Sequence, residues 1–243
     1  MESVPALGDP SIASRRAGAS RRMESPWLAI PLAEYEEHMC HPGIYQAGFL
    51  ATVLSDQLAV FGPESLAVVG CAGGNGFDRI DPRVTKRVVG IDINPDYLRT
   101  ARNRYAGRFE CLDLYAADIE GTTTSFGSVE FVYAALIFEY VDISQALSNL
   151  NSLCDPGGHL VTVLQLPSAS AEPVSPSPFA SLRALSPIMR LIEPAALASV
   201  AVEAGFAPVS SSRSRLPSGK EFAIDVFCKA ATGDHIERPQ EKA

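Results

Sequence analysis

The sequence predicts an α/β protein with a doubly wound, mostly parallel sheet of seven strands that carries an antiparallel strand at its C-terminal end. Two observations predict this fold class. Five short runs that are apolar throughout alternate with segments of helical periodicity, which is typical of a parallel sheet covered on both faces. Four glycines within residues 70–76 directly follow the first run, where a doubly wound sheet has its first strand-to-helix turn.

The composition bounds the class of protein. The chain has 243 residues, 47% of them hydrophobic and 20% charged, so it is long enough to bury one large core. Its formal net charge of −8 argues against nucleic acid as the main partner, because phosphate contacts need a basic face. No apolar run approaches the ~18 residues of a membrane helix, so we expect no membrane partner. The five cysteines form no C-x-x-C pair, which favours free thiols in a reducing cytoplasm over disulfides or a metal site.

The amino-acid composition of the chain changes near both ends. Residues 1–22 lack the apolar segment of a signal peptide and are predicted to form a disordered tail. Residues 23–62 are predicted to form an N-terminal helical cap, because apolar side chains recur at helical spacing over residues 44–61. The main domain is expected over residues 63–232, and residues 233–243 are expected to be a polar tail.

The strands and helices of the main domain are predicted from short apolar runs and from the residues that begin or end helices. Buried strands are predicted at residues 65–70, 87–93, 109–118, 129–138 and 159–166. Helices are predicted at residues 95–106, opened by Asn94 and Pro95, at residues 143–154, stopped by Pro-Gly-Gly, and at residues 193–206.

Two features close the domain. Residues 167–187 hold five prolines and many serines, and they are too long for an ordinary loop, so we expect a lid or an insertion. The last two strands, residues 207–216 and 221–230, are joined by Pro-Ser-Gly-Lys and are predicted to run antiparallel.

The glycine turn and one acid carry the first functional hypothesis. Glycine allows the backbone to adopt positive φ and to approach a ligand closely, so the turn is predicted to cradle one. Asp92 ends the second predicted strand, 18 residues beyond Gly74, where an acid accepts hydrogen bonds from a ribose diol. A dinucleotide fingerprint fails because position 79 is Arg79, and a P-loop fails because no Lys with Ser or Thr follows Gly76. A nucleoside cofactor without a bound diphosphate is therefore predicted.

Several segments in order resemble the class I S-adenosylmethionine-dependent methyltransferases. They are "VVGCAGGNG", "VVGIDINPDYL", "YAADIE", "VEFVYAALIFEYVD" and "LNSLCDPGGHLVTV", together with the last helix and two strands. The resemblance implies the Rossmann-like methyltransferase fold, S-adenosyl-L-methionine as cofactor and S-adenosyl-L-homocysteine as product. It covers residues 64–166 well and 190–230 loosely. Val68 stands where the family usually has an acid, and Ala72 where it usually has the middle glycine.

The resemblance also implies a set of cofactor-binding residues. Asp92 would bind the ribose, Asp118 would face the adenine amino group with Ile119 beside it, and the glycine turn would pass the methionine part. The implied residues are Gly70, Cys71, Ala72, Gly73, Gly74, Gly76, Asp92, Ile93, Asp118, Ile119 and Ala135. No metal is expected, because the fifth strand exits into a stretch without an acid before Glu172.

The acceptor is less defined. We expect methyl transfer to a small-molecule or peptide acceptor, with oxygen favoured as the methylated atom. His38, Tyr35 and Glu139 are candidates for a base or an acceptor-binding group, and ordinary packing or surface roles are the alternative for each. A catalytically inactive module that binds S-adenosylmethionine and scaffolds a partner is the alternative function. An oxidoreductase using NAD or a nucleotide sugar is disfavoured by the missing third glycine. The sequence carries no signal for an oligomeric state.

Overall fold

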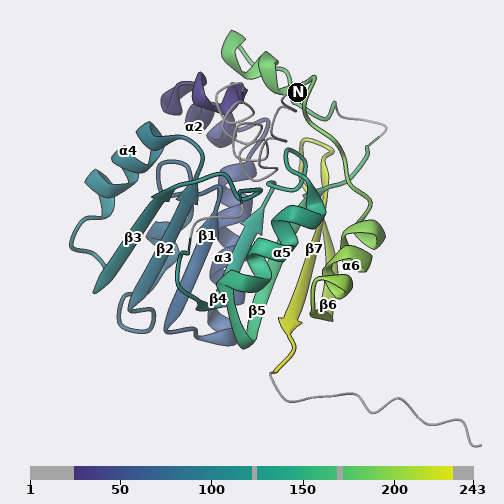
Figure 1. Ribbon diagram of the computed structural model, residues 1–243. Helices are drawn as coiled ribbons and strands as arrows, with labels where there is room; N and C mark the ends of the chain where they lie inside the picture. The colour runs from purple at the N-terminus through teal and green to yellow at the C-terminus, as the bar shows by residue number, and fades with distance from the viewer. Residues whose placement is uncertain (1–24, 122–124, 169–171, 232–243) are drawn as a thin grey trace, which may run out of the picture.

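The computed structural model of this chain describes residues 25–121, 125–168 and 172–231, so the predicted tails 1–22 and 233–243 lie outside the described residues. A seven-stranded sheet forms the centre of the molecule (Figure 1). Its strands are β1 (Ser65–Val69), β2 (Arg87–Asp92), β3 (Cys111–Ala116), β4 (Val129–Ala135), β5 (Cys154–Gln165), β6 (Phe206–Arg215) and β7 (Glu221–Lys229).

The strand order confirms the predicted fold class. The order is β3-β2-β1-β4-β5-β7-β6, and the chain crosses from one half of the sheet to the other between β3 and β4. Pairs among β1 to β5 are parallel, whereas β7 runs antiparallel to both β5 and β6. The antiparallel strand is therefore the C-terminal one. Because strand order reverses between β1 and β4, the carboxyl ends of these two strands open the crevice in which doubly wound proteins bind ligands.

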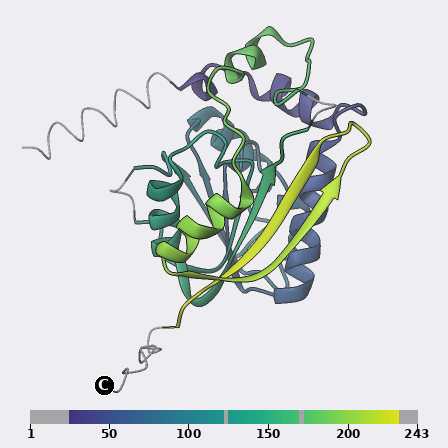
Figure 2. The ribbon, with the colours of Figure 1, turned by 90° about the vertical axis from the view of Figure 1, so that its right-hand side faces the viewer.

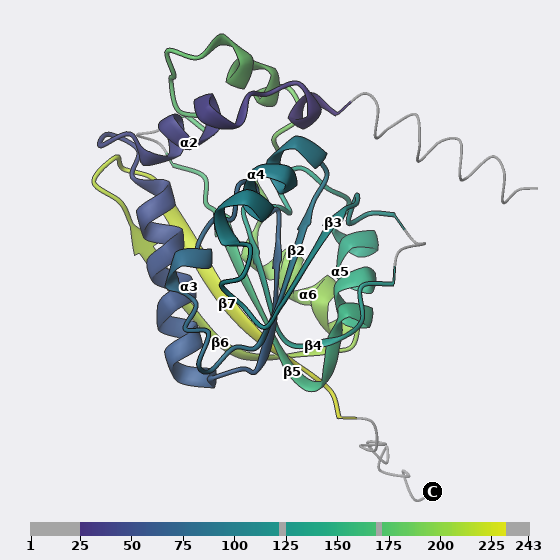
Figure 3. The same cartoon turned by 90° about the vertical axis from the view of Figure 1, so that its left-hand side faces the viewer.

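Helices cover both faces of the sheet. They are α3 (Gln46–Phe61), α4 (Pro95–Tyr105), α5 (Ile143–Leu153) and α6 (Pro194–Glu203), whereas α2 (Leu32–Cys40) lies beyond the carboxyl edge of the sheet. Figure 3 shows α3 on one side of the sheet and α5 and α6 on the other. The alternation of side chains along β1 divides the core between these faces: Leu66 and Val68 pack with α3 and α4, and Ala67 and Val69 pack with α5 and α6. Strands that are apolar throughout thus serve two cores.

A second layer lies across the carboxyl ends of the parallel strands (Figure 2). It consists of the short 3₁₀ helices η1 (Pro26–Leu28) and η3 (Ala180–Leu185) together with α2. Ile30, Leu182 and Leu185 are buried in a small apolar cluster between them. Residues 26–45 of the predicted cap therefore pair with residues 180–185 of the predicted lid, whereas α3 belongs to the helix layer of the sheet.

The passage from α5 to β5 differs from the expectation. The helix ends at Leu153 and the strand begins at Cys154, so the Pro-Gly-Gly segment lies inside β5 and not between the two elements. Cys154 pairs with Val129, and the register then shifts between Val129 and Phe131. The irregularity accommodates the proline, which has no N–H for the ladder. Among the described residues, no helix is long and apolar enough to cross a membrane.

Candidate cofactor and acceptor site

One cavity of about 990 Å³ lies between the sheet and the capping layer. Residues from the carboxyl ends of β1, β2, β4 and β5 line its floor, and residues of η1, α2 and η3 line its roof. Ligand pockets measure roughly 300–1,000 Å³, so this cavity lies at the upper end of the range for small-molecule sites.

The glycine turn after β1 is held against β2 and packs tightly. The N–H of Gly70 donates to the carbonyl of Ile91 at 2.8 Å. Gly74 has a φ of +96°, and a Cβ there would lie 2.4 Å from the Tyr105 ring of α4. Gly70 has a φ of +70°, and its Cβ would lie 2.9 Å from Ile137. Both the backbone conformation and the neighbouring side chains therefore require glycine, and the turn stays thin beside the cavity.

Asp92 presents a buried carboxylate to this cavity. Its Oδ2 accepts the N–H of Ala72 at 2.8 Å, and its Oδ1 accepts the N–H of Asn94 at 2.8 Å. The side chain is 8% exposed, and burial raises its pKa to about 6 although both backbone hydrogen bonds act in the opposite direction. Each oxygen keeps lone pairs for a further donor. A carboxylate oriented in this way fits the two hydroxyl groups of a ribose.

The turn after β3 places the next two predicted residues. Asp118 is half-buried, and its Oδ1 accepts the N–H of Glu120 at 3.0 Å. Ile119 is buried, and its carbonyl accepts the side-chain amide of Asn149 on α5 at 2.7 Å. The contact with α5 fixes the turn, so that a carboxylate and an apolar side chain stand side by side at the cavity. This pair suits a heteroaromatic ring with an exocyclic amine.

Most of the predicted cofactor-binding residues line the cavity. They are Gly70, Ala72, Gly74, Gly76, Asp92, Ile93, Asp118, Ile119 and Ala135. Cys71 and Gly73 belong to the same turn but are not among the lining residues. The Cys71 thiol is buried in the core beside Gly90, and Gly73 faces the ion pair of Arg104 with Glu36.

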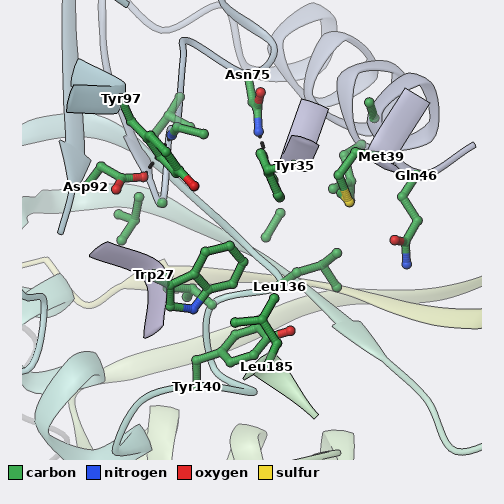
Figure 4. A pocket seen from close by; sticks show the side chains of 18 of the residues that line it. Trp27, Tyr35, Met39, Gln46, Asn75, Asp92, Tyr97, Leu136, Tyr140 and Leu185 are labelled. Carbon is green, nitrogen blue, oxygen red and sulfur yellow. Dashed lines mark hydrogen bonds between the residues drawn. The ribbon is translucent and has the colours of Figure 1, made fainter. Parts of the chain in front are cut away.

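Aromatic side chains stand around one part of the cavity (Figure 4). Trp27 of η1 makes edge contacts with Tyr35 at 5.7 Å and with Tyr140 at 5.2 Å between ring centroids. Tyr35 stacks on Tyr97 of α4 at 6.3 Å, and its hydroxyl accepts the side-chain amide of Asn75 at 3.0 Å. These rings come from four separate segments of the chain, and together they shield part of the cavity at the carboxyl ends of the strands.

The environment of Tyr35 keeps its phenol protonated. Burial raises the pKa of Tyr35 well above its usual value, and the charge of Asp92 acts in the same direction. The hydroxyl is also engaged with Asn75. Tyr35 therefore shields the site and does not serve as a base at neutral pH.

A polar cluster occupies a different end of the cavity from Asp92. The Lys220 ammonium donates to Oε1 of Gln165 at 2.9 Å and to the carbonyl of Pro173 at 2.8 Å. The Gln165 amide donates to the same carbonyl at 2.8 Å, and Gln46 donates to Oε1 of Gln165 at 3.4 Å. Figure 4 shows Gln46 and Asp92 on opposite sides of the cavity. The cluster therefore lies apart from the predicted ribose site.

His38 of α2 lines the cavity near this cluster. It is 8% exposed, and its Nδ1 is buried without a hydrogen-bond partner in the part of the chain that the structure describes. Burial lowers the pKa of His38, and the charges of Lys220 and His41 lower it further. The imidazole is therefore neutral near pH 7.

Glu139 stands behind the wall of the cavity. It is fully buried and is not among the lining residues. Its Oε1 accepts the N–H of Gln165 at 2.8 Å. Burial raises the pKa of Glu139 to about 7, whereas the Gln165 hydrogen bond and the Lys220 charge act in the opposite direction. This placement supports a role in holding the end of β5, and it gives Glu139 no direct access to an acceptor.

Sequence reasoning did not single out Gln165 and Lys220. Gln165 is the next-to-last residue of the predicted strand 159–166, so its place near the carboxyl end of the sheet was a usable signal. Lys220 lies in the turn between the last two strands and reaches the cavity only because β7 pairs with β5. Within the described residues, no group of three or more His, Cys, Asp or Glu side chains could hold a metal ion.

Comparisons with known proteins agree with this geometry. Residues 67–162 match the family described as methyltransferase domain. A trans-aconitate 2-methyltransferase from Rhodopseudomonas palustris (strain BisB18) is 28% identical over 149 residues, which cover 60% of this chain and 52% of that enzyme. The chain thus spans about half the length of the curated relative that it matches.

Solved structures show the same fold at low identity. N-methyltransferase NodS from Bradyrhizobium japonicum WM9, in complex with S-adenosyl-L-homocysteine, is 18% identical with a TM-score of 0.58 over 76% of this chain and 87% of that chain. The [4+2]-cyclase SpnF is 14% identical with a TM-score of 0.57 over 73% of this chain and 81% of that chain. The fold by itself therefore does not define the reaction. The match over residues 67–162 and the shared fold support the predicted resemblance to the class I S-adenosylmethionine-dependent methyltransferases.

Proposed function

We propose that this protein transfers a methyl group from S-adenosyl-L-methionine to an oxygen atom of a small-molecule acceptor. The observation that carries the proposal is the single cavity of about 990 Å³, which joins the predicted cofactor residues to a separate polar cluster under one aromatic roof. The similarity to an enzyme named for a small organic acid supports the acceptor class.

The residues present fit the cofactor. Asp92 has free lone pairs for the ribose hydroxyls, and Asp118 with Ile119 suits the adenine ring. The thin turn from Gly70 to Gly74 leaves space for the methionine part. When bound, the cofactor supplies an electrophilic methyl group on a sulfonium. The protein does not need to generate this electrophile.

The chain contributes enclosure and alignment. Trp27, Tyr35 and Tyr140 exclude water from the site, and the walls hold the acceptor in one orientation. Alignment of two reactants in one cavity supplies up to about 7–11 kcal/mol of the barrier reduction. During transfer a lone pair of the acceptor oxygen forms the O–CH₃ bond, the S–CH₃ bond breaks, and its electron pair remains on sulfur. S-adenosyl-L-homocysteine is the product.

A small molecule is favoured over a peptide. The capping layer packs an apolar cluster around Ile30, Leu182 and Leu185 over part of the cavity, and this partial enclosure favours a compact acceptor over an extended chain. The free thiols of all five cysteines support the cytoplasm as the proposed compartment.

The test uses the purified protein with methyl-labelled S-adenosylmethionine. Acceptor candidates are phenols, carboxylic acids, aliphatic alcohols and amines of similar size, and product formation is followed through S-adenosylhomocysteine. Labelled ethers or esters are the expected products. Tight binding of S-adenosylhomocysteine without turnover of any acceptor would instead favour the inactive binding module.

A further inference from the structure

We propose that Lys220 is the acceptor-anchoring residue of this site and that the acceptor binds as a preformed oxyanion, from an acidic hydroxyl such as a phenol or from a carboxylic acid. This inference rests on the proposed function and deepens it, because it assigns the chemical class of the acceptor. Neither the sequence nor the relatives point to Lys220.

The first argument is the setting of the Lys220 ammonium. Lys220 is 3% exposed and lines the cavity. Two of its three N–H groups donate to neutral oxygens, those of Gln165 and Pro173, which leaves one donor uncommitted among the described contacts. In the described part of the chain, Lys220 forms no ion pair with a carboxylate. A buried cation without a direct counter-ion favours the binding of an anion.

The nearest internal acid does not supply that counter-ion. Glu139 interacts with Lys220 through its charge but forms no ion pair with it, and its Oε1 already accepts from Gln165. Burial raises the pKa of Glu139 to about 7, so this carboxyl carries less than a full charge near neutrality. Burial also lowers the pKa of Lys220 to about 8, which still leaves the ammonium mostly protonated at pH 7. The Lys220 ammonium therefore has no carboxylate in direct contact at this end of the cavity, among the residues that the structure describes.

The second argument concerns the proton. His38 lines the cavity at this end, but burial lowers its pKa and the charge of Lys220 lowers it further. Proton transfer to His38 would place a second cation beside the ammonium. An acceptor that has already lost its proton to solvent avoids this cost. Methyl transfer then joins an oxyanion to a methyl group and yields a neutral ether or ester, while Lys220 keeps its proton throughout.

The rest of the wall defines the non-reacting part of the acceptor. Apolar and aromatic side chains form a large part of the lining, and they include Met39, Leu50, Leu136, Ile137, Tyr140 and Leu185. Such a surface accepts a flat hydrocarbon ring or a short branched chain. The expected acceptor therefore carries an acidic oxygen on a largely apolar body.

The test measures binding at equilibrium in protein saturated with S-adenosylhomocysteine. The probes are two anions, 4-nitrophenolate and benzoate, with their neutral counterparts 4-nitroanisole and methyl benzoate. 4-Nitrophenol also reports its own ionisation, because its anion absorbs in the visible range. The unmodified protein is expected to bind the anions at least about tenfold more tightly than the neutral compounds and to lower the apparent pKa of bound 4-nitrophenol.

The variants separate charge from structure. Lys220→Gln keeps an N–H donor for Gln165 and Pro173 but removes the charge, and it is expected to abolish the preference for anions. Lys220→Arg restores the charge and is expected to restore part of the preference. Lys86→Met is the matched control, because Lys86 is exposed and donates to Pro82 outside the cavity.

Each variant is also titrated with S-adenosylhomocysteine. Loss of that binding in the unmodified protein contradicts the proposed function itself. Normal cofactor binding combined with equal affinity for anions and neutral probes overturns the role of Lys220, as does an anion preference that survives in Lys220→Gln. Failure of all four probes to bind overturns the acceptor class. Preference for one anion over the other decides between a phenol and a carboxylic acid.

Discussion

Replacement of Asp92 by Asn changes charge at almost constant shape. Both carboxylate oxygens accept backbone N–H groups, those of Ala72 and Asn94, at 2.8 Å. An amide offers only one oxygen, so in Asp92→Asn its NH₂ group must face one of these donors. The variant therefore loses one backbone hydrogen bond and the charge that would attract the ribose hydroxyls.

Asp92→Asn is expected to change both the affinity for the cofactor and the pH dependence of stability. Loss of a charged hydrogen bond to a cofactor hydroxyl costs about 1.5–3 kcal/mol, so the affinity for S-adenosylhomocysteine is expected to fall about 10- to 100-fold. Burial raises the pKa of Asp92 to about 6 in the folded protein, above its value of 3.8 when free. Because the carboxyl binds its proton more tightly in the folded protein, it contributes about 3 kcal/mol to the free energy of unfolding below pH 4. This contribution is lost as the pH rises through 6. Asp92→Asn removes this pH dependence.

The same pKa predicts a pH profile for binding. The ionised carboxylate is the form that accepts from the ribose, and at pH 5 only about one-tenth of Asp92 is ionised. Affinity of the unmodified protein should therefore fall about tenfold between pH 7.5 and pH 5.

Calorimetric titration with S-adenosylhomocysteine at several pH values measures the affinity and its dependence on pH. Asp92→Asn should be weak and nearly independent of pH, while Asp96→Asn, an exposed change on α4, should behave like the unmodified protein. Unchanged affinity in Asp92→Asn, or a flat pH profile in the unmodified protein, refutes the assignment of Asp92.

Three further predictions concern the turn, the polar cluster and the capping layer. Ala72 has a φ of +46°, a conformation that costs a non-glycine residue about 1 kcal/mol. Ala72→Gly should therefore slightly raise the midpoint of thermal unfolding, and a clear decrease contradicts the strain argument. Burial raises the pKa of Glu139 to about 7 from 4.5, so ionisation of Glu139 lowers the stability of the folded protein as the pH rises through 7. Glu139→Gln should therefore raise the unfolding midpoint more at pH 8 than at pH 5, and an equal change at both pH values contradicts the raised pKa. Deletion of residues 1–24 should leave the affinity for S-adenosylhomocysteine unchanged, whereas deletion of residues 1–45 removes the roof of the cavity and should lower it at least about tenfold; equal affinities would show that the capping layer plays no part.

Local patterns determined the sheet and the predicted cofactor wall. The alternation of apolar runs with helical segments predicted a parallel sheet, and the structure confirms its order and its antiparallel last strand. Asp92 was predicted because it ends a strand beyond the glycine turn, whereas Asp118 was implied by the resemblance to the methyltransferase motifs. Both line the cavity because the carboxyl ends of parallel strands meet at one edge. These inferences need only information within a few residues of each site.

The reason for the glycines was only partly local. Their number predicted a thin turn, and positive φ values at Gly70 and Gly74 agree with that. The structure adds that Tyr105 and Ile137 occupy the space where side chains would stand. These neighbours lie about 30 and 65 residues away along the chain, so no pattern in the turn itself could identify them.

The acceptor end was decided by tertiary structure alone. Gln165 and Lys220 are 55 residues apart, and they meet because β7 inserts antiparallel next to β5. His38 and Gln46 reach the same cavity from the helices before the sheet. A lysine in a hairpin turn is usually solvated, and nothing in its sequence neighbours distinguishes one that is buried. The cofactor half of the site is thus encoded by residues near strand ends, whereas the acceptor half exists only once distant segments have packed together.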